Sequence, residues 1–242
     1  MEKNKLFCIP YAGGSSIVYN SWQKFFDINF DLSLIELSGR GERHKSAFYQ
    51  TFDEAVADVF KNIKNGINTT PYALLGHNMG GLIAYELYFK IKEAGLPLPF
   101  HIFLSGLRPP HLKSKNISNL PEPEFIKEII KTGTYLKKIL NNNVLADIFL
   151  PVLKADYKAF ETYTFNNSRE KLNCPITVFT GENDCINRDE ILQLADYTNS
   201  DFNVHTFSEE NFFINREQSC QKIIALINSY FKKNELKLFS AN

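Results

Sequence analysis

One short segment has the spacing of a nucleophile-bearing turn but lacks the nucleophile. The segment Leu74 to Gly81 begins as an apolar strand candidate and contains Gly76-x-Asn78-x-Gly80 before a helix candidate. This arrangement matches the nucleophile elbow, strand then G-x-S-x-G then helix, with Asn78 in the place of the serine. The central residue of an elbow has a strained backbone, so residues two positions away must lack a Cβ that would clash. The sequence therefore predicts an intact elbow whose central side chain is a carboxamide.

Two further positions follow the chain order of an elbow fold, which is nucleophile, acid, then histidine. Asp184 follows the fifth strand candidate, and Asn211 stands where a histidine is expected, between the sixth strand candidate and the last helix. The amide nitrogen of Asn78 is conjugated with its carbonyl and is a poor nucleophile. Asn211 cannot accept a proton near neutral pH. Because losing a triad member commonly costs a factor of about 10⁴ or more, we predict slow residual hydrolysis at most.

Other residues near this set are weak substitutes for the missing groups. His77 directly precedes the elbow residue, and we predict a packing or supporting role for it. Cys185 follows Asp184, but a lone cysteine without a base is usually inert. His205 lies in the sixth strand candidate, where a packed or solvated histidine is expected. The remaining histidines are predicted on loops or at the surface: His44, His101 and His111.

Strand and helix patterns alternate along most of the chain. Six short apolar runs are predicted to be strands: Leu6–Ile9, Leu32–Leu37, Tyr72–Leu75, Phe100–Leu104, Ile176–Phe179 and Phe202–Phe207. Two segments carry their apolar residues on one helical face, Asp53–Ile63 and Gln218–Phe231, and Gly80–Ile91 is predicted to be a long apolar helix. The last residues, Asn234–Asn242, are expected to fray. The alternation predicts an α/β fold with a mostly parallel central sheet flanked by helices.

Residues 109–165 break this alternation and show only helical or loop patterns. Three helices are predicted there, at Phe125–Ile130, Leu136–Leu140 and Val144–Phe160. A helical insert between two strands is a candidate lid over a site at the carboxyl ends of the strands, and a simple packing layer is the alternative. We predict a single domain over residues 1–242 with a helical lid insert at about 109–165.

The overall composition narrows the classes of function. The 27 basic and 27 acidic side chains balance, so no net charge directs the protein to nucleic acid or to an anionic membrane. No apolar run approaches the roughly 18 residues that span a bilayer, and no secretory leader precedes the first apolar run. The four cysteines match neither a zinc pattern nor a CxxC pair. We therefore expect a cytoplasmic protein without a metal site or disulfides.

Several motifs, in the right order, resemble the stand-alone (type II) thioesterases of nonribosomal peptide and polyketide synthases, which have the α/β-hydrolase fold. The matching stretches are Phe7 to Gly14 for the opening strand and oxyanion loop, Gly39 to Arg43 for a G-R-x-x-R turn, Phe149 to Asp156 for part of the lid, and Cys174 to Ile176 with Gly181 to Asp184 for the approach to the acid. The family's histidine lies in a G-G-H-F-F pattern, and Glu209 to Phe213 stands in its place.

The resemblance implies the chemistry of a working member. Serine attacks the thioester of an acyl or peptidyl chain on the phosphopantetheine arm of a carrier-protein domain, histidine takes the serine proton, and aspartate orients the histidine. Backbone N–H groups, here those of Ala12 and Met79, would stabilise the oxyanion. No cofactor is expected apart from the arm of the carrier protein, and the expected partners are carrier domains of a synthase.

Three functional hypotheses follow from a sequence that keeps the motifs of the fold but has asparagine in place of two of the three triad residues. The favoured one is a pseudo-thioesterase that binds a carrier or synthase partner as a scaffold, chaperone or regulator. The second is a non-hydrolytic enzyme that positions an intermediate for cyclisation or proton transfer, with Asp184 as the base. The last is a slow thioesterase that uses an unforeseen nucleophile.

Overall fold

A single parallel sheet organises the computed structural model, which describes residues 3–26, 30–67, 71–113, 115–131, 134–208 and 211–240. Its strands are β1 (Asn4–Ile9), β2 (Phe30–Leu34), β3 (Tyr72–His77), β4 (His101–Ser105), β5 (Ile176–Gly181) and β6 (Phe202–Phe207). They lie in the order β2-β1-β3-β4-β5-β6, and every neighbouring pair is parallel. The predicted α/β class with a mostly parallel sheet is confirmed.

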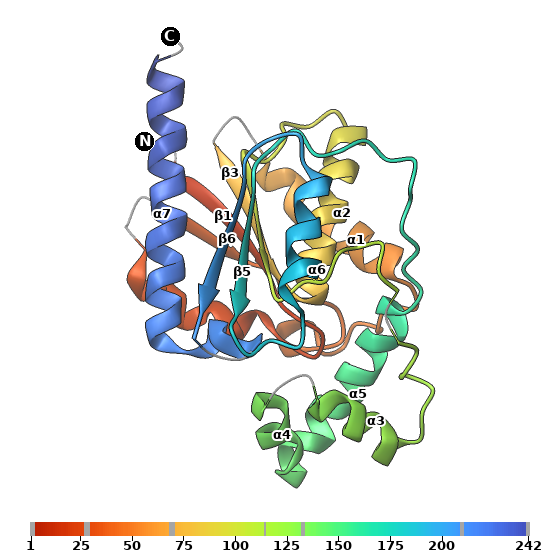
Figure 1. Cartoon of the computed structure of the whole chain (residues 1–242). Coiled ribbons are helices and arrows are strands. Elements are labelled where there is room, and N and C mark those ends of the chain that lie inside the picture. Colours follow the sequence, from red (N-terminus) through yellow and green to blue (C-terminus); the bar gives the residue numbers. More distant parts are fainter. Residues whose placement is uncertain are drawn as a thin grey trace.

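Helices cover both faces of this sheet (Figure 1). One face packs against α1 (Phe52–Ile63), α2 (Met79–Glu93) and α6 (Arg188–Gln193), and the other packs against α7 (Glu217–Ser240) and the 3₁₀ segment η1 (Ser16–Phe25). Shorter 3₁₀ segments are η2 (Gly41–Arg43), η3 (Lys64–Gly66), η4 (Leu194–Tyr197) and η5 (Asn211–Asn215). Strand side chains alternate between the two cores, as period-two geometry requires.

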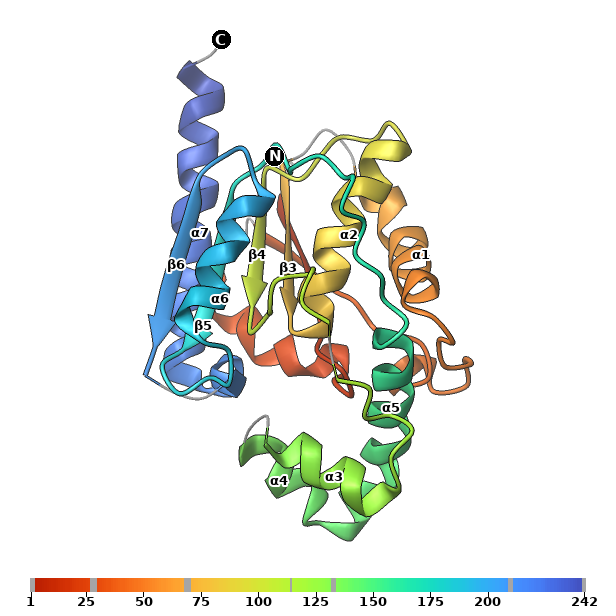
Figure 2. The same cartoon turned by 45° about the vertical axis from the view of Figure 1, so that its right-hand side comes forward.

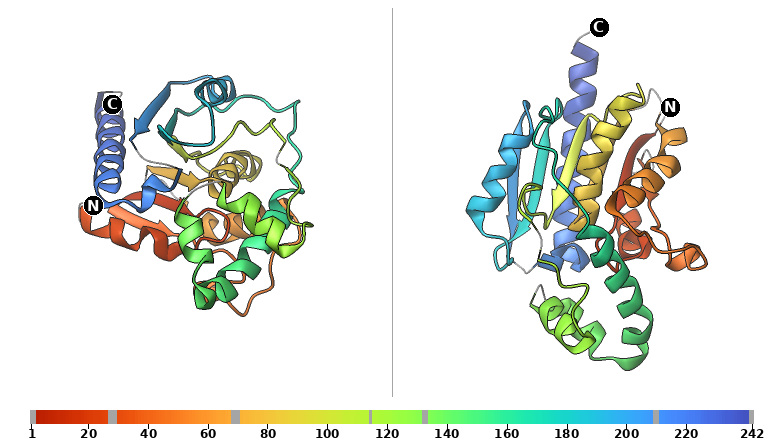
Figure 3. Two further views of the ribbon diagram at one scale, coloured as in Figure 1. Left: turned by 60° about the horizontal axis from the view of Figure 1, so that its bottom comes forward. Right: turned by 90° about the vertical axis from the view of Figure 1, so that its right-hand side faces the viewer.

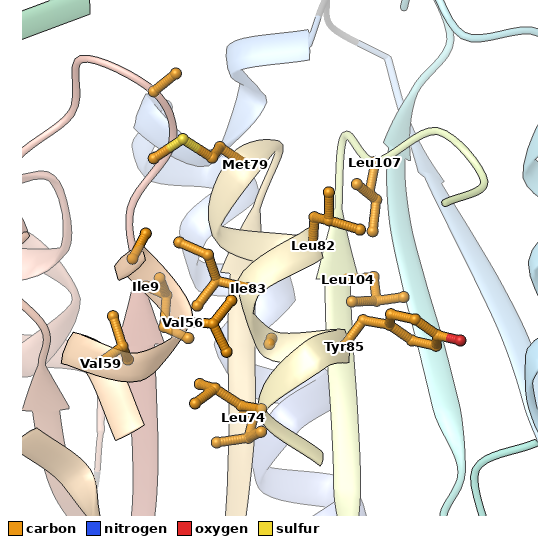
Figure 4. Packing of buried hydrophobic residues seen from close by; sticks show 14 of the residues in the cluster. Ile9, Val56, Val59, Leu74, Met79, Leu82, Ile83, Tyr85, Leu104 and Leu107 are labelled. Carbon is orange, nitrogen blue, oxygen red and sulfur yellow. The ribbon is translucent and has the colours of Figure 1, made fainter. Parts of the chain in front are cut away.

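Strand β1 shows this division of the core. Phe7 and Ile9 join the cluster on the α1 and α2 side, whereas Leu6 and Cys8 join the cluster on the α7 side. Figure 4 shows how side chains of β1, β3, α1 and α2 interdigitate around the start of α2. Met79, the first residue of α2, is only 1% exposed within this cluster, so the turn before α2 is fixed by the core on which it rests.

The predicted insert between β4 and β5 contains α3 (Glu122–Ile130), α4 (Thr134–Leu140) and α5 (Asn143–Phe160). These bounds extend the predicted helices by zero to three residues at each end. The three helices lie beyond the end of the sheet toward which the strand arrowheads point (Figure 2). Pro151 lies inside α5, where it removes one hydrogen bond of the helix.

Two predictions, one about the C-terminal helix and one about His101, are wrong. Helix α7 continues to Ser240 rather than fraying from Asn234, and it projects past the sheet (Figure 3). Asn4 Nδ2 donates to Glu235 Oε1 over 2.7 Å and ties this extension to β1. His101 is not at the surface, because it is 2% exposed in β4 and bonded to Thr177 Oγ1. Across the described residues, no helix combines the length and apolar character needed to span a membrane.

Candidate active site

The segment after β3 has the backbone of a nucleophile elbow. Asn78 has φ 50° and ψ −117°, and it is the only non-glycine residue with a positive φ among those described. A Cβ on Gly76 would lie 2.0 Å from the carbonyl oxygen of Gly80, and one on Gly80 would lie 2.3 Å from that of Ile9. No side chain fits at either glycine, which is the physical reason for the G-x-N-x-G spacing.

Asn78 caps the helix that its own turn begins. Its Oδ1 accepts the backbone N–H of Met79 over 2.8 Å. Its Nδ2 points toward the carbonyl oxygen of Gly106, at a longer 3.5 Å. The first N–H groups of a helix have no partner within the helix, and a side-chain oxygen at the N-cap satisfies one of them. The carboxamide therefore bonds to the very N–H that was predicted as an oxyanion donor.

The loop after β1, which contains the other predicted donor, Ala12, lies beneath the insert. A Cβ on Gly13 would lie 2.7 Å from the ring of Phe149 and 2.9 Å from Leu153, both in α5. The Gly13 N–H donates to Asp156 Oδ2, also in α5, over 2.6 Å. Helix α5 thus contacts the residue next to Ala12 directly.

A buried ion pair fixes this contact. Arg40 Nη1 and Nη2 each donate to one oxygen of Asp156 over 2.5 Å, and the two side chains are 4% and 2% exposed. Arg40 Nη1 also donates to the carbonyl oxygen of Gly14 over 3.1 Å. Both residues lie in stretches that resemble family motifs, but no spacing pattern in the sequence indicates that they pair. The pair links the insert, the loop after β1 and the loop after β2.

Asp184, the predicted acid, lies in the loop after β5. Its Oδ1 accepts the N–H of Ile186 over 3.2 Å. Its Oδ2 is buried and has no hydrogen-bond partner within the described part of the chain. Burial is the main cause that raises the pKa of this carboxyl group above its usual value. A triad aspartate would accept a hydrogen bond from a histidine, and position 211 carries no histidine to donate one.

Asn211 begins η5, just after β6, and its side chain lies outside what the structure describes, as do residues Glu209 and Glu210. The next residue places this segment beside the elbow. The ring of Phe212 lies 5.6 Å from that of His77 and 5.0 Å from that of Tyr11, measured between centroids. The residues adjacent to Asn78 and Asn211 are therefore in contact across the carboxyl edge of the sheet.

The other candidate groups are poorly placed for catalysis. His77 is 1% exposed, bonds through Nδ1 to Ser105 Oγ, and has its pKa lowered to about 3 by burial. Cys185 is exposed, yet partial desolvation and the nearby Asp184 raise the pKa of its thiol to about 11, so the thiol stays protonated near neutral pH. His205 lies over the α7 face, with Nε2 3.5 Å from the hydroxyl of Tyr230.

Comparisons with known proteins agree with this architecture. The sequence profile of the thioesterase domain family matches residues 4–230. Gramicidin S biosynthesis protein GrsT of Aneurinibacillus migulanus is 32% identical over 215 residues, which cover 88% of this chain and 83% of that protein. The medium-chain S-acyl fatty acid synthase thioesterase of Rattus norvegicus is 30% identical over 219 residues, with 87% of this chain and 81% of that protein covered.

Solved structures extend the match to three dimensions. ClbQ from the colibactin NRPS/PKS pathway superposes with a TM-score of 0.90 at 31% identity, covering 97% of this chain and 99% of that one. The RedJ thioesterase from the prodiginine pathway of Streptomyces coelicolor superposes with a TM-score of 0.86 at 30% identity, covering 94% and 85%. The chain therefore belongs to the thioesterase family, and the predicted kinship with type II thioesterases of α/β-hydrolase fold is confirmed.

Proposed function

We propose that this protein binds acyl or peptidyl thioesters on the phosphopantetheine arms of synthase carrier domains and is impaired in their hydrolysis. One observation carries the proposal. The elbow backbone is built around Asn78, with φ 50° and ψ −117°, yet a carboxamide stands where the reaction needs a hydroxyl. Names of relatives such as the gramicidin S biosynthesis protein and ClbQ of the colibactin pathway support the synthase setting.

The residues proposed for the site are Asn78, Asp184 and Asn211, and the N–H groups of Ala12 and Met79 stand at the positions of the family's oxyanion donors. No general base remains at position 211, and the pKa of about 11 at Cys185 argues against a substitute thiol nucleophile. We assign the helices of the insert as a lid over this site, since α5 packs on Gly13. No cofactor of the protein itself is part of the proposal, because the reactive thioester is on the arm of the carrier.

Binding and turnover are tested separately. Calorimetric titration uses carrier domains whose arm bears an acyl amide in place of the thioester, with the same carrier lacking the arm as the control. We expect binding that depends on the acylated arm. Hydrolysis of acyl-N-acetylcysteamine thioesters should stay near the uncatalysed rate. No binding to any acylated carrier, or turnover comparable to that of an active relative, would remove the proposal.

A second candidate function uses Asp184 as a base in a reaction other than hydrolysis, such as cyclisation or proton transfer. The raised pKa of its carboxyl group and the burial of its Oδ2 favour this candidate, since a carboxylate with a raised pKa is a stronger base. Replacement of Asp184 with asparagine should then change the product of the pathway. An unchanged product with this variant in place would exclude the candidate.

A further inference from the structure

The side chain of Asn78 has a second consequence besides the loss of a nucleophile. In an elbow fold, the N–H of the residue after the nucleophile is one of two backbone donors for the oxyanion. Here that N–H belongs to Met79, and Asn78 Oδ1 accepts it over 2.8 Å. When a thioester carbonyl enters the site, the N–H of Met79 is already hydrogen-bonded to Asn78 Oδ1.

The orientation of the carboxamide is set by both of its ends. Oδ1 faces the N–H of Met79, and Nδ2 faces the carbonyl oxygen of Gly106 at 3.5 Å. Turning the amide over would place two donors against each other at one end and two acceptors at the other. The backbone of the turn is also fixed, because a Cβ fits at neither Gly76 nor Gly80. The fixed backbone of the turn and the orientation of the carboxamide therefore both keep Oδ1 at the N–H of Met79.

We propose that the Asn78 carboxamide occupies half of the oxyanion hole and so withholds one of its two donors from a bound thioester. Removing a single oxyanion donor from an active enzyme typically lowers kcat by about 10²–10³-fold. The substitution thus removes both the attacking group and part of the electrostatic stabilisation of the adduct. The role assigned to Asn78 rests on the proposed function, in which a thioester is held without being hydrolysed, and it explains how such a thioester would stay intact.

The chain offers a direct probe of this donor. It has only two methionines, Met1 and Met79. Protein labelled with ¹⁵N-methionine therefore gives at most two backbone amide signals, and the Met79→Leu variant identifies the signal of Met79 by its loss. Its hydrogen exchange is measured without ligand in the wild type, in Asn78→Ala and in Asn78→Asp. A matched control is Asn187→Ala, since Asn187 Oδ1 caps a different helix, α6, over the same 2.8 Å.

We expect exchange of the Met79 amide to quicken by a factor of about 3 to 10 in Asn78→Ala, the factor that corresponds to one hydrogen bond. Asn78→Asp keeps an acceptor oxygen and should stay close to the wild type, as should Asn187→Ala. Equal exchange in the wild type and in Asn78→Ala would overturn the proposal. So would equal acceleration in Asn187→Ala, because the effect would then report on overall stability.

A ligand titration separates this proposal from the proposed function. Octanoyl-pantetheine thioester should shift the Met79 amide signal in Asn78→Ala more than in the wild type, because only the variant presents a free donor. A probe that binds both proteins and shifts this signal equally contradicts the occupied donor. If the probe binds neither protein, the proposed thioester binding fails, while the exchange result without ligand still decides the role of the Asn78 side chain.

Discussion

Removal of the Asp156 carboxylate should destabilise the protein far more than removal of an ordinary surface charge. Asp156 accepts from both terminal nitrogens of Arg40 over 2.5 Å and from the N–H of Gly13 over 2.6 Å. The two charged side chains are 4% and 2% exposed, so water could not solvate the charge of an Arg40 that has lost its partner. Breaking a buried pair by removing one partner costs about 3–5 kcal/mol, and we expect that loss for Asp156→Ala.

Urea unfolding at pH 7 measures this loss as a change in the free energy of unfolding. For a chain of this size the same change lowers the melting temperature by roughly 6–20 °C. The matched control is Asp147→Ala, an exposed aspartate in the same helix, which should change stability by no more than about 0.5 kcal/mol. Replacing both partners, with Arg40→Met and Asp156→Leu, should recover most of the loss. A loss below about 1 kcal/mol for Asp156→Ala would refute the reasoning, since that is the range of screened surface pairs.

Four further predictions concern the site and its surroundings. Burial lowers the pKa values of His77 and His101 to about 3, below the unfolded value of about 6.5, so the unfolded chain binds more protons. The free energy of unfolding should therefore fall by about 2 kcal/mol for each histidine as the pH drops from 7 to 5. A free energy of unfolding that does not change over this pH range in urea unfolding would contradict this prediction. The pKa of Asp184 is raised, so its ionisation destabilises the fold as pH rises, and Asp184→Asn should raise the free energy of unfolding more at pH 7 than at pH 4; the reverse order contradicts this. Gly76→Ala should lower the free energy of unfolding by about 3 kcal/mol or more, because its Cβ would lie 2.0 Å from a backbone oxygen, and a loss under about 1 kcal/mol would show that the elbow can relax. Cys185 should react with iodoacetamide at pH 8 more slowly than free cysteine, because its thiol has a pKa of about 11; labelling at the free rate would argue otherwise.

Much of the fold could be predicted because each strand is short, apolar and bounded by turn residues. The sixth strand, Phe202–Phe207, has the weakest pattern and still matches β6 residue for residue. Segment η1 could not be predicted, because its stability comes from burying Trp22 and Tyr19 against α7 and the sheet. No hydrophobic periodicity in the local sequence indicates that packing. The extension of α7 was missed because its polar residues resemble a frayed end. Its bond from Asn4 to Glu235 spans 231 positions of the sequence.

The site shows the same division between local and distant signals. The elbow around Asn78 could be predicted because glycine spacing encodes its backbone geometry over five residues. The Arg40–Asp156 pair joins residues 116 positions apart, so no spacing rule identifies it. The bond between the Asn78 side chain and Met79 depends on a side-chain rotamer, which residue types alone do not fix. Chemistry that depends on the backbone pattern was therefore accessible from sequence, and chemistry that depends on side-chain orientation was not.

The most direct test of the central claim is revival of hydrolysis by Asn78→Ser together with Asn211→His. Turnover of an acyl-N-acetylcysteamine thioester is compared across the wild type, each single variant and the double variant, after urea unfolding has shown that all four are folded. Because nucleophile and base act as a unit, we predict that kcat/KM rises by roughly 10³-fold or more in the double variant and by little in either single variant. A wild-type protein already as active as the double variant, or a folded double variant no better than the singles, would contradict the account.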